Sequence, residues 1–170
     1  MNLKNLTDHS LMQTTTQFVR EERQVLTNLL HHFREIDRRR LYSDYKYSSL
    51  HKMLVGHFGY SDDEAYRRIS AMRLITEIPE VELKINQGEL TLSHLGLAQS
   101  FFRQEQKLTA VDLPKESKLD LLQQISAQSI REAQRTVLSK SSAPEQLRPD
   151  RVTTVSDRKN ECRFTGSYSL

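Results

Sequence analysis

Hydrophobic positions recur at helical spacing most clearly near the start of the chain. Between Thr16 and Leu41 they predict one long amphipathic helix. Its apolar stripe comprises Phe18, Val25, Leu26, Leu29, Leu30, Phe33 and Ile36. Because such a stripe is stable only when covered, we expect it to pack on another part of the protein. Before it, Thr7 and Asp8 offer a cap for a short first turn.

Residues 47–87 predict two helices joined by a tight turn. Ser48 or Ser49 can cap the first helix. Gly59 ends it, since a residue without a Cβ atom adopts left-handed backbone at little cost. A short turn containing glycine between two helices indicates a helix-turn-helix unit.

The second helix of this unit starts at a capping box formed by Ser61 and Glu64 and runs to about Ile75. At 100° per residue it has two faces. The predicted buried face carries Ala65, Ile69, Met72 and, at its edge, Ile75. The predicted outward face carries Tyr66, Arg67, Ser70 and Arg73.

The outward face predicts contacts with DNA. No acidic residue lies between Ala65 and Ile75, so this face is basic, with one aromatic ring and one hydroxyl. In DNA-binding helix-turn-helix proteins the second helix enters the major groove, where such residues meet phosphates and guanine edges. The alternative is an ordinary solvated helix whose arginines pair with neighbouring glutamates. Arg68, beside the apolar face, is interpreted as a structural partner for an acid.

A second basic cluster ends the long helix. Arg38, Arg39 and Arg40 follow closely on Glu35 and Asp37. One interpretation is a solvated face held by ion pairs three and four residues apart. The other is a patch that contacts DNA phosphates beside the helix-turn-helix unit. Both interpretations stay open, because three arginines exceed the acids nearby.

Shorter helices are predicted as far as Lys140. Their signals are Pro79 before residues 80–86, Gly88 after them, Ser93 before residues 94–107, Pro114, and a second capping box of Ser129 and Glu132. Residues 141–170 are polar and predict a linker or tail, with two β-prone pieces, Val152–Val155 and Cys162–Thr165. The sequence therefore predicts an all-α, multi-helix domain over residues 8–140, followed by a flexible or weakly β tail.

The composition of the chain limits its fold class, its binding partners and its cellular compartment. The 170 residues include no Trp, five Gly and four Pro, which favours helices over a turn-rich β fold. The net charge of +3 permits binding to nucleic acid. The single cysteine, Cys162, excludes an internal disulfide and fits a reducing compartment. No apolar run approaches the ~20 residues that span a membrane, and no signal-peptide core is visible, so we expect a cytoplasmic protein.

The chain also resembles a known family. Two segments carry the likeness: FREIDRRRLYSDYKYSSLHKML, and GYSDDEAYRRISAMRLITEIPEVELKINQGELTLSHLGLAQSFFRQE. Within them, GYS…AYRRISAMRL, IPEVE, G-x-L-x-L and QSFFRQE follow one another as in the N-terminal helical region of bacterial HNH endonucleases. The resemblance covers roughly residues 10–140 and implies association with DNA. In that family the helical region precedes the catalytic module.

The catalytic module itself is not recognisable here. HNH nucleases use one histidine as a general base and further ligands to hold a divalent metal. Six histidines are present, and none forms a metal-binding motif with a cysteine pair or a second histidine: His9, His31, His32, His51, His57 and His94. We therefore expect no catalytic residues, metal ligands or cofactor in this chain, and interpret it as ending before the HNH module.

Two functions remain as hypotheses. The first is the DNA-binding, non-catalytic part of an HNH endonuclease family protein. The second is a helical protein-interaction module that forms a homodimer through the long amphipathic helix, without binding DNA. Salt dependence of DNA binding, compared with concentration dependence of the molecular mass, distinguishes them.

The first prediction is that this chain alone does not cleave DNA. Metal-dependent hydrolysis needs several ligands around one ion, and the sequence offers no such set. The measurement is nicking of supercoiled plasmid by the purified protein with Mg²⁺ or Mn²⁺, for which we expect no activity. Nicking that disappears on substitution of a single histidine would contradict the prediction.

Overall fold

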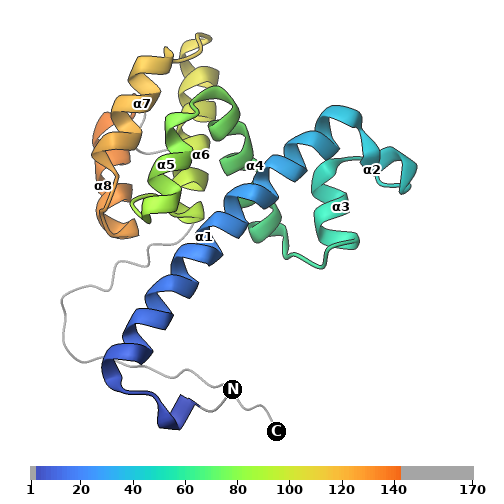
Figure 1. Ribbon diagram of the computed structural model, residues 1–170. Coiled ribbons are helices and arrows are strands. Elements are labelled where there is room, and N and C mark those ends of the chain that lie inside the picture. The colour runs from blue at the N-terminus through green and yellow to red at the C-terminus, as the bar shows by residue number, and fades with distance from the viewer. Residues whose placement is uncertain (1–2, 143–170) are drawn as a thin grey trace, which may run out of the picture.

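A computed structural model describes residues 3–142. In this range the chain forms α-helices and no strand, which confirms the predicted all-α, multi-helix class (Figure 1). The helices are α1 (Asp8–Arg39), α2 (Leu41–Asp44), α3 (Leu50–Gly56), α4 (Asp62–Glu77), α5 (Glu80–Gln87), α6 (Leu92–Thr109), α7 (Lys115–Gln124) and α8 (Ile130–Lys140), after a 3-10 turn at Leu3–Asn5. None of these helices is long and apolar enough to cross a membrane. The β-prone pieces predicted in the tail lie outside the described residues.

Helix α1 is longer than predicted, because the expected short first turn and long helix are one element. Thr7 caps it through a hydrogen bond of 3.2 Å from the Ser10 N–H to its hydroxyl. The three consecutive threonines that follow, residues 14–16, do not interrupt it. Each donates its hydroxyl to the carbonyl four residues before, at 2.8 Å. The helix ends at Arg40, whose backbone is left-handed (φ 55°).

Most of the predicted helix signals are confirmed. Ser49 caps α3, while capping boxes start α4 and α8 at the predicted serines. Gly88 ends α5 with φ +82°. One prediction was wrong: α6 is capped by Thr91, not by Ser93. His94 takes the third helical position there, and its ring nitrogen accepts the Thr91 N–H as a glutamate would.

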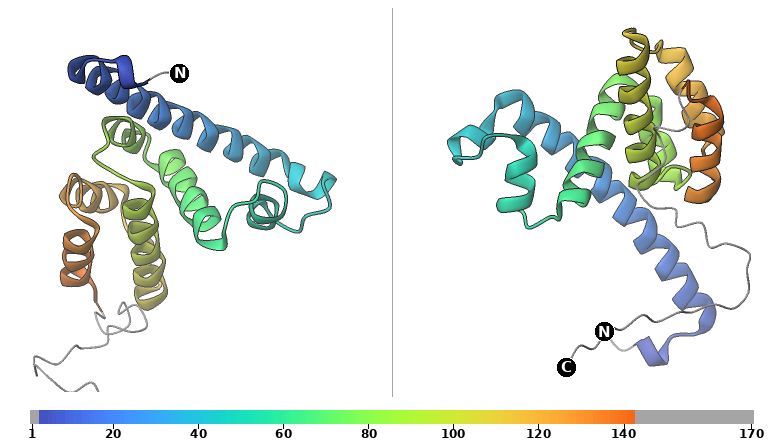
Figure 2. Two further views of the ribbon diagram at one scale, coloured as in Figure 1. Left: turned by 90° about the horizontal axis from the view of Figure 1, so that it is seen from below. Right: turned by 180° about the vertical axis from the view of Figure 1, so that it is seen from behind.

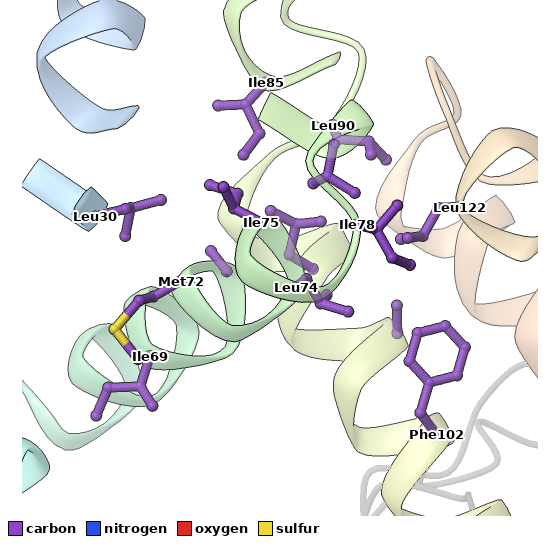
Figure 3. Packing of buried hydrophobic residues seen from close by; sticks show 14 of the residues in the cluster. Leu30, Ile69, Met72, Leu74, Ile75, Ile78, Ile85, Leu90, Phe102 and Leu122 are labelled. Carbon is purple, nitrogen blue, oxygen red and sulfur yellow. The ribbon is translucent and has the colours of Figure 1, made fainter. Parts of the chain in front are cut away.

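Helix α4 lies in the middle of the fold. Helices α1, α3 and α5 pack on one part of its surface and α6 on another (Figure 2). Figure 3 shows its side chains meeting Leu30 of α1 on one side and approaching Phe102 of α6 on the other. Its buried residues consequently point in several directions rather than along one stripe: Ala65, Ile69, Ser70, Ala71, Met72, Leu74 and Ile75.

Small residues allow α4 and α6 to approach closely. Ser70 and Ala71 of α4 are fully buried, as is Ala98 of α6. A Cβ atom added to Gly96 would lie 3.2 Å from the Arg67 Cγ atom and 4.0 Å from its Cα atom. A larger side chain at these positions would force the helices apart, because interiors are packed as densely as organic crystals.

A buried cation joins α4 to the start of α7. The side chain of Lys118 is only 5% exposed, and its ammonium lies 2.7 Å from a Glu77 carboxylate oxygen and 2.9 Å from one of Asp112. It also lies 5.8 Å from the centre of the Phe102 ring. Burial acts to lower the pKa of Lys118, but the hydrogen bonds from its ammonium to the two carboxylates outweigh burial and raise it. The ammonium is therefore stabilised in its charged form.

The first part of α1 extends away from the other helices. Its buried residues are Thr27, Leu30 and Phe33, and none precedes Thr27. In all three views the first turns of α1 run beyond the helices that pack on its later part (Figures 1 and 2). The apolar stripe predicted to need a partner surface is therefore covered along its second half only.

Candidate nucleic-acid interface

The four residues predicted to form an outward DNA-binding face do not share one surface. Ser70 has no exposed surface, and its hydroxyl has no hydrogen-bond partner among the described residues. The prediction that Ser70 faces outward was wrong. It assumed that α4 buries a single face, whereas α6 covers the side on which Ser70 lies. Ser70 is therefore not accessible to DNA in this structure, whereas Arg73 of the same helix is exposed.

The other three predicted residues of α4 lie in different surroundings. Tyr66 is half-buried, and its hydroxyl shares a hydrogen bond of 2.9 Å with Ser100 of α6. Arg67 lies against Gly96 of α6, with its guanidinium 3.7 Å from the Asp63 carboxylate. Arg73 is exposed. Tyr66 and Arg67 therefore belong to the α4–α6 surface, and Arg73 lies apart from them.

The arginines at the end of α1 follow the ion-pair interpretation in part. Arg38 makes two hydrogen bonds to Glu35, at 2.7 and 2.6 Å, and Arg39 donates to the same carboxylate at 2.6 Å. These hydrogen bonds hold the pKa of Glu35 at about 2. Arg40, the left-handed residue that follows the last residue of α1, is exposed. Whether these arginines also contact DNA stays a prediction.

A hollow lined by basic side chains lies between α6 and α8, with the first turns of α4 at its edge. It has a volume of about 840 Å³. Its cationic residues are Arg67 of α4 and Arg131 and Arg135 of α8. Hydroxyl and amide groups come from Tyr66, Ser93, Ser100 and Gln134, and an apolar floor comes from Leu97, Ile130, Val137 and Leu138.

A second hollow continues this surface along α6. Its volume is about 500 Å³, and it shares Tyr66 and Ser100 with the first. Arg103 and Lys107 add two more cations, and the Arg103 guanidinium lies 5.7 Å from the centre of the Tyr66 ring. We use the name basic groove for the two hollows together. Five cationic side chains line it, and no aspartate or glutamate does.

Both ends of helix α8 are hydrogen-bonded to α6. These hydrogen bonds fix the position of α8 along one side of the basic groove. At its start, Nε2 of His94 donates to the Gln128 carbonyl at 3.0 Å. At its end, the Glu105 carboxylate accepts hydrogen bonds from Ser141 and from the backbone and hydroxyl of Ser142, at 2.6 to 3.0 Å. Because His94 and Glu105 are both buried, these contacts are shielded from water.

The two attachments respond to pH in the same direction. Burial lowers the pKa of His94, although its hydrogen bond to Gln128 partly opposes this. Burial acts to raise the pKa of Glu105, but the hydrogen bonds from Ser142 and Ser141 outweigh it and lower the pKa. Each group therefore stabilises the fold above its ordinary pKa, and the stabilisation is lost as the pH falls.

Sequence reasoning missed the α8 part of the groove. Arg131 and Arg135 are four residues apart on α8 and so lie on one face of a helix, beside Ile130 and Leu138. That spacing was the available signal. It carried no information about which helix would lie opposite, because the pairing of α6 with α8 arises from contacts between distant residues.

No cluster of three or more His, Cys, Asp or Glu side chains that could hold a metal ion occurs in residues 3–142. The chain matches no family model, no curated protein and no solved structure. The chemistry of the basic groove is therefore the main basis on which a function can be argued.

The second prediction concerns the His94 contact. The free energy of unfolding should fall between pH 7.5 and 5.5, because the unfolded state takes up a proton at a pKa of about 6.5 that the buried ring resists. The variant His94→Gln keeps a side chain that can complete the capping box but does not titrate. It should be less stable at pH 7.5 and lose less stability at pH 5.5.

Urea denaturation at the two pH values measures both quantities, and Glu105 does not interfere because it titrates below this window. His9→Gln, at an exposed position in the first turn of α1, is the control and should behave as the wild type does. An identical pH dependence for the wild type and His94→Gln would refute the assignment.

Proposed function

We propose that this chain binds the phosphate backbone of DNA through the basic groove, as the non-catalytic helical part of an HNH endonuclease-type protein. The observation that carries the proposal is the composition of the groove: five cations and no carboxylate. Cationic side chains that neutralise phosphates release condensed counterions, and this release supplies most of the affinity of sequence-independent binding. The family likeness adds the expectation of DNA and is carried by the sequence motifs alone.

The spacing of the cations suits a repeating anion. Arg103 and Lys107 are one helical turn apart on α6, as are Arg131 and Arg135 on α8, which separates each pair by about 6 Å along its helix. The hydroxyl groups of Tyr66 and Ser100 line both hollows, and since one donates to the other, the second can donate to a phosphate oxygen. Such contacts fix position on a duplex and carry no base information, so we expect binding with little sequence preference.

A carboxylate borders the groove beside one of its arginines. The side chain of Asp63 is exposed and lies 3.7 Å from Arg67. It competes with a phosphate for that guanidinium and repels the DNA backbone. Removing its charge should therefore strengthen binding, which provides a variant whose effect has the opposite sign to loss of an arginine.

A second candidate function is favoured by the floor of the groove. Leu97, Ile130 and Leu138 provide apolar contacts that a phosphate backbone does not use. An amphipathic helix of another protein, with acidic residues facing the arginines, would use both the floor and the cations. This candidate is a protein-interaction role like the alternative drawn from the sequence, but it would use the groove between α6 and α8 in place of the long helix α1.

The third prediction tests the groove by titration with duplex DNA at two salt concentrations. Arg131→Gln/Arg135→Gln should weaken binding to all sequences and reduce the salt slope by about two, since each arginine is expected to neutralise one phosphate. Asp63→Asn should bind more tightly than the wild type. Arg34→Gln/Arg73→Gln removes the same charge from exposed positions outside the groove and is the matched control.

Equally weakened binding by the groove variant and the control would show a general charge effect and refute the groove. Weakening confined to Arg34→Gln/Arg73→Gln would return the site to the exposed part of α4 and to α1. No binding by the wild type at low salt would refute the DNA proposal altogether and favour the acidic-helix candidate.

A further inference from the structure

An apolar stripe lies exposed on the first half of α1. Its members are Leu11, Met12, Phe18, Val19 and Val25, which are between 38% and 66% exposed. Leu26 continues the stripe at its end, where it is half-buried because it also packs against the core. Met12, Phe18 and Val25 each expose more than half of their surface. Large side chains scattered singly on a surface are ordinary, but a continuous stripe along one helix indicates an interaction site.

This segment has little to stabilise it within one chain. No residue of α1 before Thr27 is buried. A helix of this length that is solvated on every side is marginal in water, because most helical stability in proteins comes from packing of an apolar face. Toward Thr27 the segment contacts other elements: Arg23 donates to the Gln87 carbonyl at 3.2 Å, and Leu26 packs against the core. Among the described residues, the hydrogen bonds that the segment makes before Arg23 are local, such as the Thr7 cap and the hydrogen bond of 2.9 Å from Gln17 to Glu21. A partner surface is therefore missing along about four turns.

The stripe is complementary to a second copy of itself. Leu11, Phe18 and Val25 recur every seven residues, and so do Met12, Val19 and Leu26. When one copy is reversed about a point between Phe18 and Val19, each apolar residue meets another: Leu11 faces Leu26, Met12 faces Val25 and Phe18 faces Val19. A seven-residue repeat keeps the apolar pairs on one side of the helix, so that the same sides of two helices can stay in contact along their length.

The charges select the antiparallel arrangement. Residues 20–23 read Arg-Glu-Glu-Arg, whereas residues 14–17 read Thr-Thr-Thr-Gln. In the reversed pairing the charged block of each copy faces the neutral block of the other. In a parallel, in-register pair each charge would face its own copy, and like charges at such positions destabilise a pair of helices.

The shape of the molecule favours the same arrangement. The other helices surround only the second half of α1, so an antiparallel pair places the two bodies at opposite ends of the shared segment (Figures 1 and 2). A parallel pair would place both bodies at the same end. The overlap of residues 11–26 is about 24 Å long, at 1.5 Å per residue.

We propose that two copies of this chain associate through residues 11–26 of α1, packed antiparallel about a two-fold axis between Phe18 and Val19. The occupant of the stripe is thus a second copy of the same chain. This assignment does not depend on the function of the basic groove, since the groove lies on α4, α6 and α8. An association of this kind would give the assembly two copies of the groove.

The fourth prediction is measured first as molecular mass by sedimentation equilibrium. The wild-type mass should rise from that of the monomer toward twice that value with concentration. Phe18→Glu/Val25→Glu should stay monomeric. Its helical circular dichroism should decrease only by the contribution of the first turns of α1, which then have no partner helix. Leu83→Glu/Val111→Glu is the matched control, since these residues are 62% and 66% exposed and lie outside the stripe.

Disulfide trapping then tests the direction of the helices, in chains that also carry Cys162→Ser. Thr15 and Glu22 lie opposite one another in the antiparallel pair, because they are equally far, about three and a half residues, from the axis between Phe18 and Val19. A mixture of Thr15→Cys and Glu22→Cys chains should therefore form mixed disulfides faster than either chain pairs with itself. In that arrangement two copies of Thr15 are roughly 10 Å apart along the helix, beyond the reach of a disulfide.

Three results would overturn the proposal. The first is a wild-type protein whose mass stays that of the monomer at all concentrations. Binding of the stripe to lipid vesicles or to another protein would not rescue the proposal in that case. The second is a dimer that survives Phe18→Glu/Val25→Glu, which would place the interface elsewhere. The third is preferential self-pairing of Thr15→Cys chains, which would show a parallel arrangement.

Discussion

The close contact between α4 and α6 is the constraint on which the rest of the structure depends. Gly96 of α6 lies directly against Arg67 of α4, with no Cβ atom to keep the two helices apart, and the buried residues Ser70, Ala71 and Ala98 are small. Once α6 covers this side of α4, the opposite side is left to α1, α3 and α5. Both sides of α4 are then interior, and Arg67 near its start lies at the border with α6.

This contact also determines where a partner can bind. A helix-turn-helix protein presents one face of its second helix to DNA, and on α4 the predicted face is divided, because Ser70 is buried and Arg73 is exposed. A group of cations without a lining carboxylate lies instead between α6 and α8, where His94 and Glu105 hold α8 in place. The surface that suits an extended anion is thus created by contacts between helices, and the surface that suits a second copy lies on α1, away from it.

The sequence predicted what depends on neighbouring residues. Capping boxes, the left-handed glycine at 88 and the serine cap of α3 are decided within one helical turn, and these predictions were confirmed. The outward position of Ser70 was wrong, because the prediction counted one apolar face. Leu74 lies on α4 roughly opposite Ala65 and Met72, and it was the signal that a second face is buried. Which helix covers that face depends on residues some thirty positions away, which local periodicity does not report.

Native-state hydrogen exchange of the amides of α4 tests the central claim most directly, that α4 is interior on both sides. We predict that the amides of residues 69–75 exchange only through global unfolding, with a free energy of opening equal to the free energy of unfolding measured in denaturant. Amides in the first turns of α1 should exchange far faster when the chain is dilute. If the amides of residues 69–75 opened at a much lower free energy, as in a helix with one side free, the account would be contradicted.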